Sequence, residues 1–67
     1  MPWTHHDDET WSADASDLGL GPDKAPGPME LPDGQHATRW DPVILPGYGL
    51  IRWDAHVDGV TYAIFND

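Results

Sequence analysis

The side chains best suited to chemistry lie at the N-terminus, where two histidines precede three acids: His5, His6, Asp7, Asp8 and Glu9. Imidazole and carboxylate groups are ligands that zinc, nickel and copper accept. Adjacent residues in a flexible tail do not readily surround one ion, however, and no second ligand pair follows at the spacing of a metal site. We therefore expect an exposed acidic terminus, with a metal-binding peptide built on His5 and His6 as the weaker alternative.

The remaining residue types do not form a recognisable catalytic pattern. The chain has no cysteine, and Ser12 and Ser16 lack the glycine elbow of a nucleophilic serine. The glycines follow no predicted strand and precede no Lys-Ser or Lys-Thr pair, so no phosphate loop is indicated. His36 and His56 are expected to be ordinary, partly exposed histidines of strands. The sequence thus predicts a protein that is not an enzyme and that holds no cofactor.

The charge of the chain is strongly negative and unevenly distributed. Twelve acids against three bases give −9. Residues 1–34 hold eight acids and one lysine, a balance of −7, whereas 35–67 hold four acids and two arginines, a balance of −2. Nucleic acids and anionic membranes repel such a chain, so its charged partner is expected to be a basic protein surface. With neither a signal peptide nor an apolar run long enough to span a bilayer, the expected location is cytoplasmic or virion-associated.

Two parts of the chain differ in composition. Residues 1–35 are rich in aspartate, proline and glycine, which predicts an extended acidic arm or lid. One short helix near 10–18 is predicted there, capped by Thr10, stopped by Gly19, and apolar on the face of Trp11, Ala15 and Leu18. Residues 36–67 are richer in strand-forming residues and predict a small antiparallel β-sheet unit. Together the two parts make one domain.

The clearest element is a hairpin of strands at about 49–57 and 60–66. Asp58 and Gly59 between them are the pair that a type I′ turn requires. In this register Val57 lies opposite Val60, Ala55 opposite Tyr62, and Trp53 opposite Ile64. Side chains alternate along a strand, so one face is apolar and the other polar. The polar face carries Arg52, Asp54, His56 and Thr61.

A third strand at about 37–45 is predicted from the repeat of Arg-Trp-Asp at 39–41 and 52–54. A turn at Pro46 and Gly47 would set Arg39 opposite Asp54, Trp40 opposite Trp53, and Asp41 opposite Arg52. A loop of 46–49 would instead set Asp41 against Asp54, which is unfavourable, although proline before glycine favours a type II turn that suits hairpins poorly.

The expected fold class is therefore mainly β, a three-stranded antiparallel meander with an extended N-terminal arm. The predicted core consists of Trp40, Ile44, Ile51, Trp53, Val57, Val60, Tyr62 and Ile64. One apolar face of three strands needs a cover. The arm supplies candidates, namely Trp3, Trp11, Leu18, Leu20, Met29 and Leu31; the alternatives are a second protein or a symmetric dimer. Trp3 and Trp11 either fold back as part of a lid or serve as anchors in an interface.

The function predicted from these features is a small protein-binding module, such as an accessory subunit, an inhibitor or a virion component. Its expected contact residues are Trp3, Asp7, Asp8, Glu9, Trp11 and Leu18. The expected partner is a larger protein with a basic or aromatic-accepting groove. A nucleic-acid mimic that inhibits a DNA- or RNA-binding protein is the alternative, because a charge of −9 suits that role.

Overall fold

The protein is described by a computed structural model that covers residues 1–67 and contains seven strands and one 3-10 helix. The elements are β1 (Thr4–Asp7), β2 (Thr10–Asp14), η1 (Ser16–Leu18), β3 (Met29–Glu30), β4 (His36–Ala37), β5 (Asp41–Leu45), β6 (Gly49–Val57) and β7 (Val60–Phe65). The chain is thus mainly β. No helix in it has the length and apolar character needed to cross a membrane.

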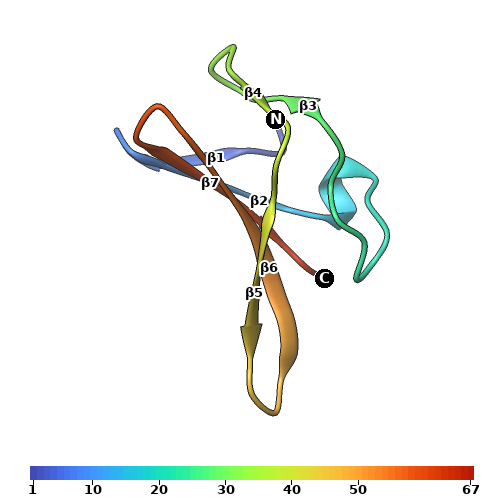
Figure 1. Ribbon diagram of the computed structural model, residues 1–67. Helices are drawn as coiled ribbons and strands as arrows, with labels where there is room; N and C mark the ends of the chain where they lie inside the picture. Colours follow the sequence, from blue (N-terminus) through green and yellow to red (C-terminus); the bar gives the residue numbers. More distant parts are fainter.

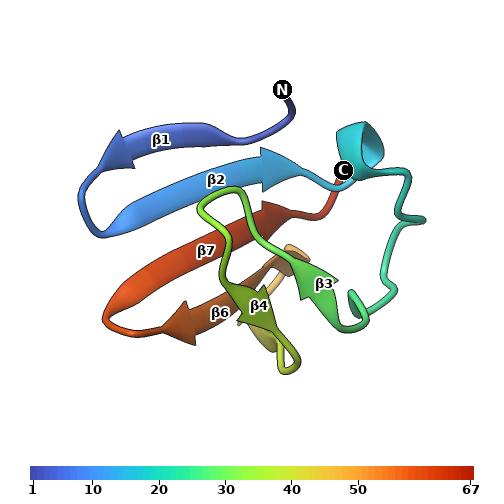
Figure 2. The same ribbon diagram turned by 90° about the horizontal axis from the view of Figure 1, so that it is seen from above.

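Five strands form one mixed sheet in the order β1-β2-β7-β6-β5, and β3 pairs with β4 in a separate small ladder (Figures 1 and 2). The predicted meander exists as β5, β6 and β7, but it is only part of the sheet. The N-terminal segment adds β1 and β2, and β2 runs parallel to β7. The helix expected near 10–18 is reduced to η1, because Trp11 and Ala13 alternate with polar neighbours onto one face of a strand rather than following a helical repeat.

The β6–β7 hairpin has the predicted register. Val57 pairs with Val60, Ala55 with Tyr62, and Trp53 with Ile64. The turn residues Asp58 and Gly59 have φ angles of 51° and 80°, as a type I′ turn requires. The local sequence therefore determines this register.

The β5–β6 register differs from the favoured prediction, because Asp41 lies opposite Asp54. Each carboxylate is paired instead with the arginine two residues before it: Arg39 Nε lies 3.2 Å from Asp41 Oδ1, and Arg52 Nε lies 2.9 Å from Asp54 Oδ1. The Arg-Trp-Asp repeat thus neutralises each acid within its own segment, and the two aspartates tolerate facing one another.

The turn of this hairpin also explains the shifted register. Gly47 has a φ angle of 84° and the Tyr48 amide donates to the Leu45 carbonyl over 3.0 Å, which fits a type II turn with proline before glycine. A type II turn twists against the strands. A second glycine in the left-handed region, Gly49, and a register shift between Val43 and Ile44 accommodate that mismatch.

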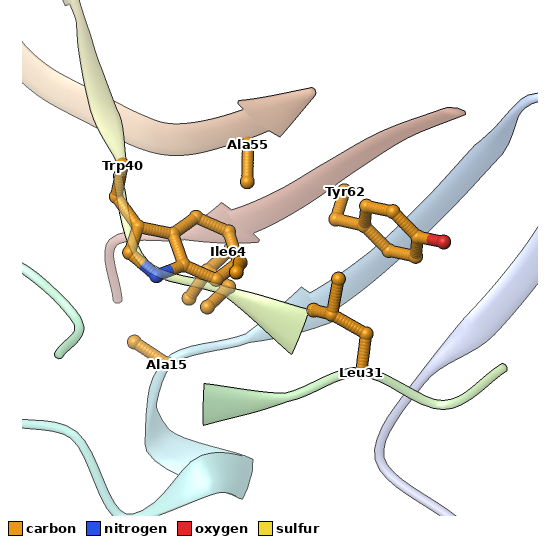
Figure 3. Close-up of a cluster of buried hydrophobic side chains, with 7 residues drawn as sticks. Ala15, Leu31, Trp40, Ala55, Tyr62 and Ile64 are labelled. Atoms are coloured by element: carbon orange, nitrogen blue, oxygen red, sulfur yellow. The ribbon is translucent and has the colours of Figure 1, made fainter. Parts of the chain in front are cut away.

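One face of the sheet, here called the covered face, packs beneath residues 15–40, here called the cover (Figure 2). Figure 3 shows the contact, in which Leu31 and Trp40 meet Ala55, Tyr62 and Ile64 of the sheet. Tyr62 and Ile64 have no exposed surface and Trp40 retains 7%. Other apolar side chains packed against this core are Trp3, Trp11, Leu18, Leu20, Met29, Trp53, Val57 and Val60. The chain therefore covers its own apolar face.

Hydrogen bonds hold the cover in place. The Tyr62 hydroxyl of the sheet donates to Asp33 Oδ2 in the turn between β3 and β4. Within the cover, the Trp40 indole donates to the Gly27 carbonyl over 3.2 Å. Burial, together with the bond to Asp33, raises the pKa of Tyr62 to about 12. The bond from Tyr62 lowers the pKa of Asp33 below its ordinary value, and the Gln35 amide adds to this effect.

Candidate partner-binding site

The opposite side of the sheet, here called the open face, has no cover and contains a hollow of about 270 Å³. Ala63 lies at its centre, with Ser12 beside it on β2 and Asp54 beside it on β6. The hollow exists because Ser12 and Ala63 are small where neighbouring positions are larger. Its lining comes from four strands and comprises His6, Thr10, Ser12, Arg52, Asp54, Thr61, Ala63 and Phe65.

The polar groups around the hollow are held by hydrogen bonds within the sheet. His6 Nε2 and Ser12 Oγ share a bond of 2.6 Å. Arg52 Nε donates to Asp54 Oδ1 over 2.9 Å, and Asp54 is 9% exposed. Asp54 Oδ2 accepts no bond from the protein, and because no buried side-chain oxygen lacks a partner, this oxygen must reach solvent.

A second feature adjoins the open face: the ten residues 42–51 contain no charged side chain. We call this segment the apolar hairpin. It extends away from the rest of the molecule (Figure 1), and β5 packs on β6 alone. Ile44 is 63% exposed, Leu45 48% and Tyr48 83%. Ile44 was expected in the core, but it lies on an edge strand beyond the reach of the cover.

Asn66 holds the base of the apolar hairpin to the rest of the protein. Its amide donates to the Ile51 carbonyl over 2.9 Å, and its side-chain Nδ2 donates to the Leu50 carbonyl over 3.2 Å and to Asp23 Oδ1 over 2.9 Å. The Asp23 amide in turn donates to Asn66 Oδ1 over 2.8 Å. This one side chain thus connects β6, the C-terminus and the cover.

Substituting Asn66→Ala is expected to lower the free energy of unfolding by about 1–2 kcal/mol, because it removes several hydrogen bonds of a half-buried amide. Urea denaturation measures the change. Thr38→Ala is the control, since Thr38 is exposed and makes no side-chain hydrogen bond, and it should stay within about 0.5 kcal/mol of the parent. Equal free energies of unfolding for the two variants would show that Asn66 does not hold the base of the apolar hairpin.

The N-terminal residues expected to contact a partner fall into two groups. The indoles pack internally: the Trp3 ring meets Tyr62 edge to face with centroids 6.2 Å apart, and Trp11 stacks on His5 at 4.0 Å. Leu18 on η1 also packs against the core. Trp11 lies on β2 of the sheet and Leu18 lies in the cover, and all three apolar side chains are partly buried. The acids of the same segment, Asp7, Asp8 and Glu9, are exposed at the turn between β1 and β2.

The structure separates the histidines that were considered as metal ligands. His5 stacks on Trp11, while His6 bonds Ser12 on the open face. No group of three or more histidine and acidic side chains is arranged to hold an ion. Among the other histidines, His36 Nε2 lies 3.8 Å from Glu30 Oε2, and His56 Nδ1 shares a hydrogen bond of 3.1 Å with Thr61 Oγ1.

Neither the hollow nor the apolar hairpin is among the sites predicted from the sequence. A signal for the hairpin was present, since ten uncharged residues are flanked by Asp41 and Arg52 in a chain of charge −9. Apolar residues in a predicted strand favour a place in the core instead. The hollow had no local signal, because it depends on β2 lying next to β7.

Comparisons with protein-family models, with curated proteins and with solved structures find no match for this chain. On the surface of the molecule, the apolar hairpin, the hollow and the exposed acids are the features that a ligand or partner can recognise.

Proposed function

We propose that the protein is a non-enzymatic protein-binding module that inserts its apolar hairpin into a groove of a larger protein. The observation that carries this proposal is the exposure of Ile44, Leu45 and Tyr48 together on a projecting hairpin without charge. Soluble proteins that act alone rarely present clustered large apolar side chains, and such clusters mark interaction sites. Tyrosine is also a frequent anchor of protein interfaces.

The charge distribution supports a basic partner. Every acidic residue except Asp54 is exposed, and the acids lie outside the apolar hairpin. Complementary charge around a groove accelerates association and orients the two proteins, whereas apolar contacts provide most of the affinity. The partner best suited to this chain therefore has an apolar groove bordered by lysine and arginine.

The edges of the sheet favour contact through side chains rather than through strand addition. Pro42 on the edge strand β5 has no amide to donate, and the edge strand β1 ends at Asp7, which Asp8 follows. Proline and charge are common protections of sheet edges against pairing with another chain. Accessory subunit, inhibitor and virion component are the roles compatible with this mode of binding, and the identity of the partner distinguishes them.

The test is capture of partner proteins by the tag-free protein from its source lysate at low and at high salt, followed by mass spectrometry. We expect one stoichiometric protein that is retained at high salt, because salt screens exposed charges but not apolar contacts. Replacing Tyr48→Ala is expected to weaken its binding by about tenfold or more, the usual cost of losing an interface anchor.

The matched control is Tyr48→Phe, which keeps the ring and should retain the captured protein. If neither Tyr48→Ala nor the double change Ile44→Ser with Leu45→Ser reduced retention of the partner protein, the proposal would be contradicted. A partner that is released steeply by moderate salt and that itself binds nucleic acid would favour the mimic instead. Self-association abolished by Tyr48→Ala would identify a second copy of the chain as the occupant of the hairpin.

A further inference from the structure

We infer that Asp58, in the turn between β6 and β7, is a site of spontaneous conversion to isoaspartate. The chain contains two Asp-Gly pairs, one at 33–34 and one at 58–59. Glycine has no side chain to shield its amide nitrogen, so in such a pair that nitrogen can attack the side chain of the preceding aspartate. The two pairs are alike in sequence, and the structure distinguishes them. The reaction requires neither a partner nor a cofactor, so it is independent of the proposed function.

The reaction first releases and then takes up one water molecule. The Gly59 nitrogen attacks Cγ of Asp58, and the amide proton leaves with the hydroxyl of the protonated carboxyl group as water. The product is a cyclic succinimide. Water then opens the ring at either of its carbonyl groups, which restores aspartate or leaves the main chain running through the former side-chain carbon. No electrons are transferred, and the isoaspartate chain has the same mass as the parent.

The attacking nitrogens of the two pairs differ in their hydrogen bonds. The Gly34 amide donates to the Leu31 carbonyl over 3.1 Å. The Gly59 amide donates to no protein group, and it lies in a turn where both residues are exposed. A bonded amide must lose its hydrogen bond before the nitrogen can attack, and that loss has a cost. The free nitrogen is therefore the one that follows Asp58.

The two carboxyl groups differ in the same direction. Both oxygens of Asp33 accept hydrogen bonds, Oδ2 from the Tyr62 hydroxyl and Oδ1 from the Gln35 amide over 3.2 Å. The bond from Tyr62, with a smaller effect from Gln35, lowers the pKa of Asp33 and so keeps it in the ionised form, which cannot release a hydroxyl. Asp58 accepts a single bond, at Oδ2 from Gln35 Nε2 over 3.1 Å. Both reacting groups are thus less restrained at Asp58 than at Asp33.

Conversion lengthens the main chain by one carbon inside the turn. Asp58 and Gly59 have φ angles of 51° and 80°, the left-handed pair that closes a two-residue type I′ turn. That turn sets the register in which Val57 pairs with Val60, and an added backbone atom does not fit it. The converted chain is therefore expected to unfold at a lower urea concentration than the freshly purified protein.

The experiment is incubation of the full chain in warm, mildly acidic buffer, followed by proteolysis and mass spectrometry with electron-transfer fragmentation, which distinguishes isoaspartate from aspartate. Isoaspartate is expected to form at Asp58 about fivefold faster than at Asp33, the rate ratio that one ordinary hydrogen bond provides. In concentrated urea neither turn persists, so the two positions should convert at equal rates. This control separates the effect of the fold from that of the sequence.

Substitutions separate the two turns. Tyr62→Phe removes the donor to Asp33 and should raise conversion there by about fivefold without changing conversion at Asp58. Asp58→Gly leaves a Gly-Gly pair, which suits a type I′ turn, and should form no isoaspartate between β6 and β7. Should Tyr62→Phe fail to fold, Gln35→Ala provides the converse test. It removes the side-chain donor to Asp58 and keeps the backbone donor to Asp33, so only conversion at Asp58 should rise.

The inference is overturned if Asp33 converts as fast as Asp58 in the folded chain, or if Asp58 converts only after urea is added. It is also overturned if the Asp58→Gly chain accumulates as much isoaspartate as the parent. Selective conversion at Asp58 that disappears in urea as the two rates become equal is the result that supports it.

Discussion

Replacing Trp40→Ala is expected to lower the free energy of unfolding by about 3–5 kcal/mol, the usual cost of truncating a buried tryptophan. Trp40 is 7% exposed, and its indole packs from the cover onto the sheet while donating to the Gly27 carbonyl (Figure 3). A domain of 67 residues has a total stability of only about 3–10 kcal/mol. The variant should therefore be largely unfolded at ambient temperature.

Urea denaturation followed by near-ultraviolet circular dichroism measures this effect. Tyr48→Ala is the matched control, because Tyr48 is an aromatic residue that is 83% exposed, and it should change stability by less than about 0.5 kcal/mol. A Trp40→Ala protein within about 1 kcal/mol of the parent would be incompatible with a tightly packed cover, given the size of the side chain removed.

Stability is also expected to fall as the pH rises from 10 to 12, because of Tyr62. The folded state raises the pKa of Tyr62 from 10.0 to about 12. The unfolded chain therefore releases this proton first, so the contribution of Tyr62 is complete below pH 10 and is lost as the pH approaches 12. Since one pKa unit corresponds to about 1.4 kcal/mol, the loss is of the order of 1–3 kcal/mol.

At acidic pH the dependence of stability on pH has the opposite sign. The folded state lowers the pKa of Asp33 below 3.8, so its contribution is present above that pH and is lost as the pH falls through the folded value. Tyr62→Phe removes the donor and should weaken the pH dependence at both ends. Tyr48→Phe, which removes the other, exposed tyrosine, should leave it unchanged. Urea midpoints across the pH range test this, and identical profiles for Tyr62→Phe and the parent would contradict the role of the Tyr62–Asp33 bond.

Trp3 and Trp11 of the N-terminal segment are partly buried against the core, so the buried part of their apolar area stabilises the fold. Tyr48, at 83%, is a far more exposed aromatic residue than Phe65, at 38%. In the proposed function, the exposed acids of the N-terminal segment attract a basic partner toward the apolar hairpin.

The sequence by itself determined the features that depend on neighbouring residues. Asp58 and Gly59 require a type I′ turn, and a two-residue turn permits only one register, so the pairing of β6 with β7 and the division of their residues between two faces followed. The excess of acids and the absence of cysteine were likewise properties of composition alone. The residues that could cover the sheet could also be named from the sequence, because only a few large apolar side chains lie outside the predicted strands.

Only the tertiary structure decided the features that depend on distant residues. Trp11 pairs with Tyr62 across 51 residues of sequence, and no local pattern distinguishes that parallel pairing from a short helix. The same pairing brings Ser12 next to Ala63 and so creates the hollow. Ile44 is apolar and lies in a strand, yet whether such a residue is buried depends on how far the cover extends over the sheet. Both features, the pairing of distant strands and the extent of the cover, depend on the packing energy of the whole chain. The residues at any one position do not determine that energy.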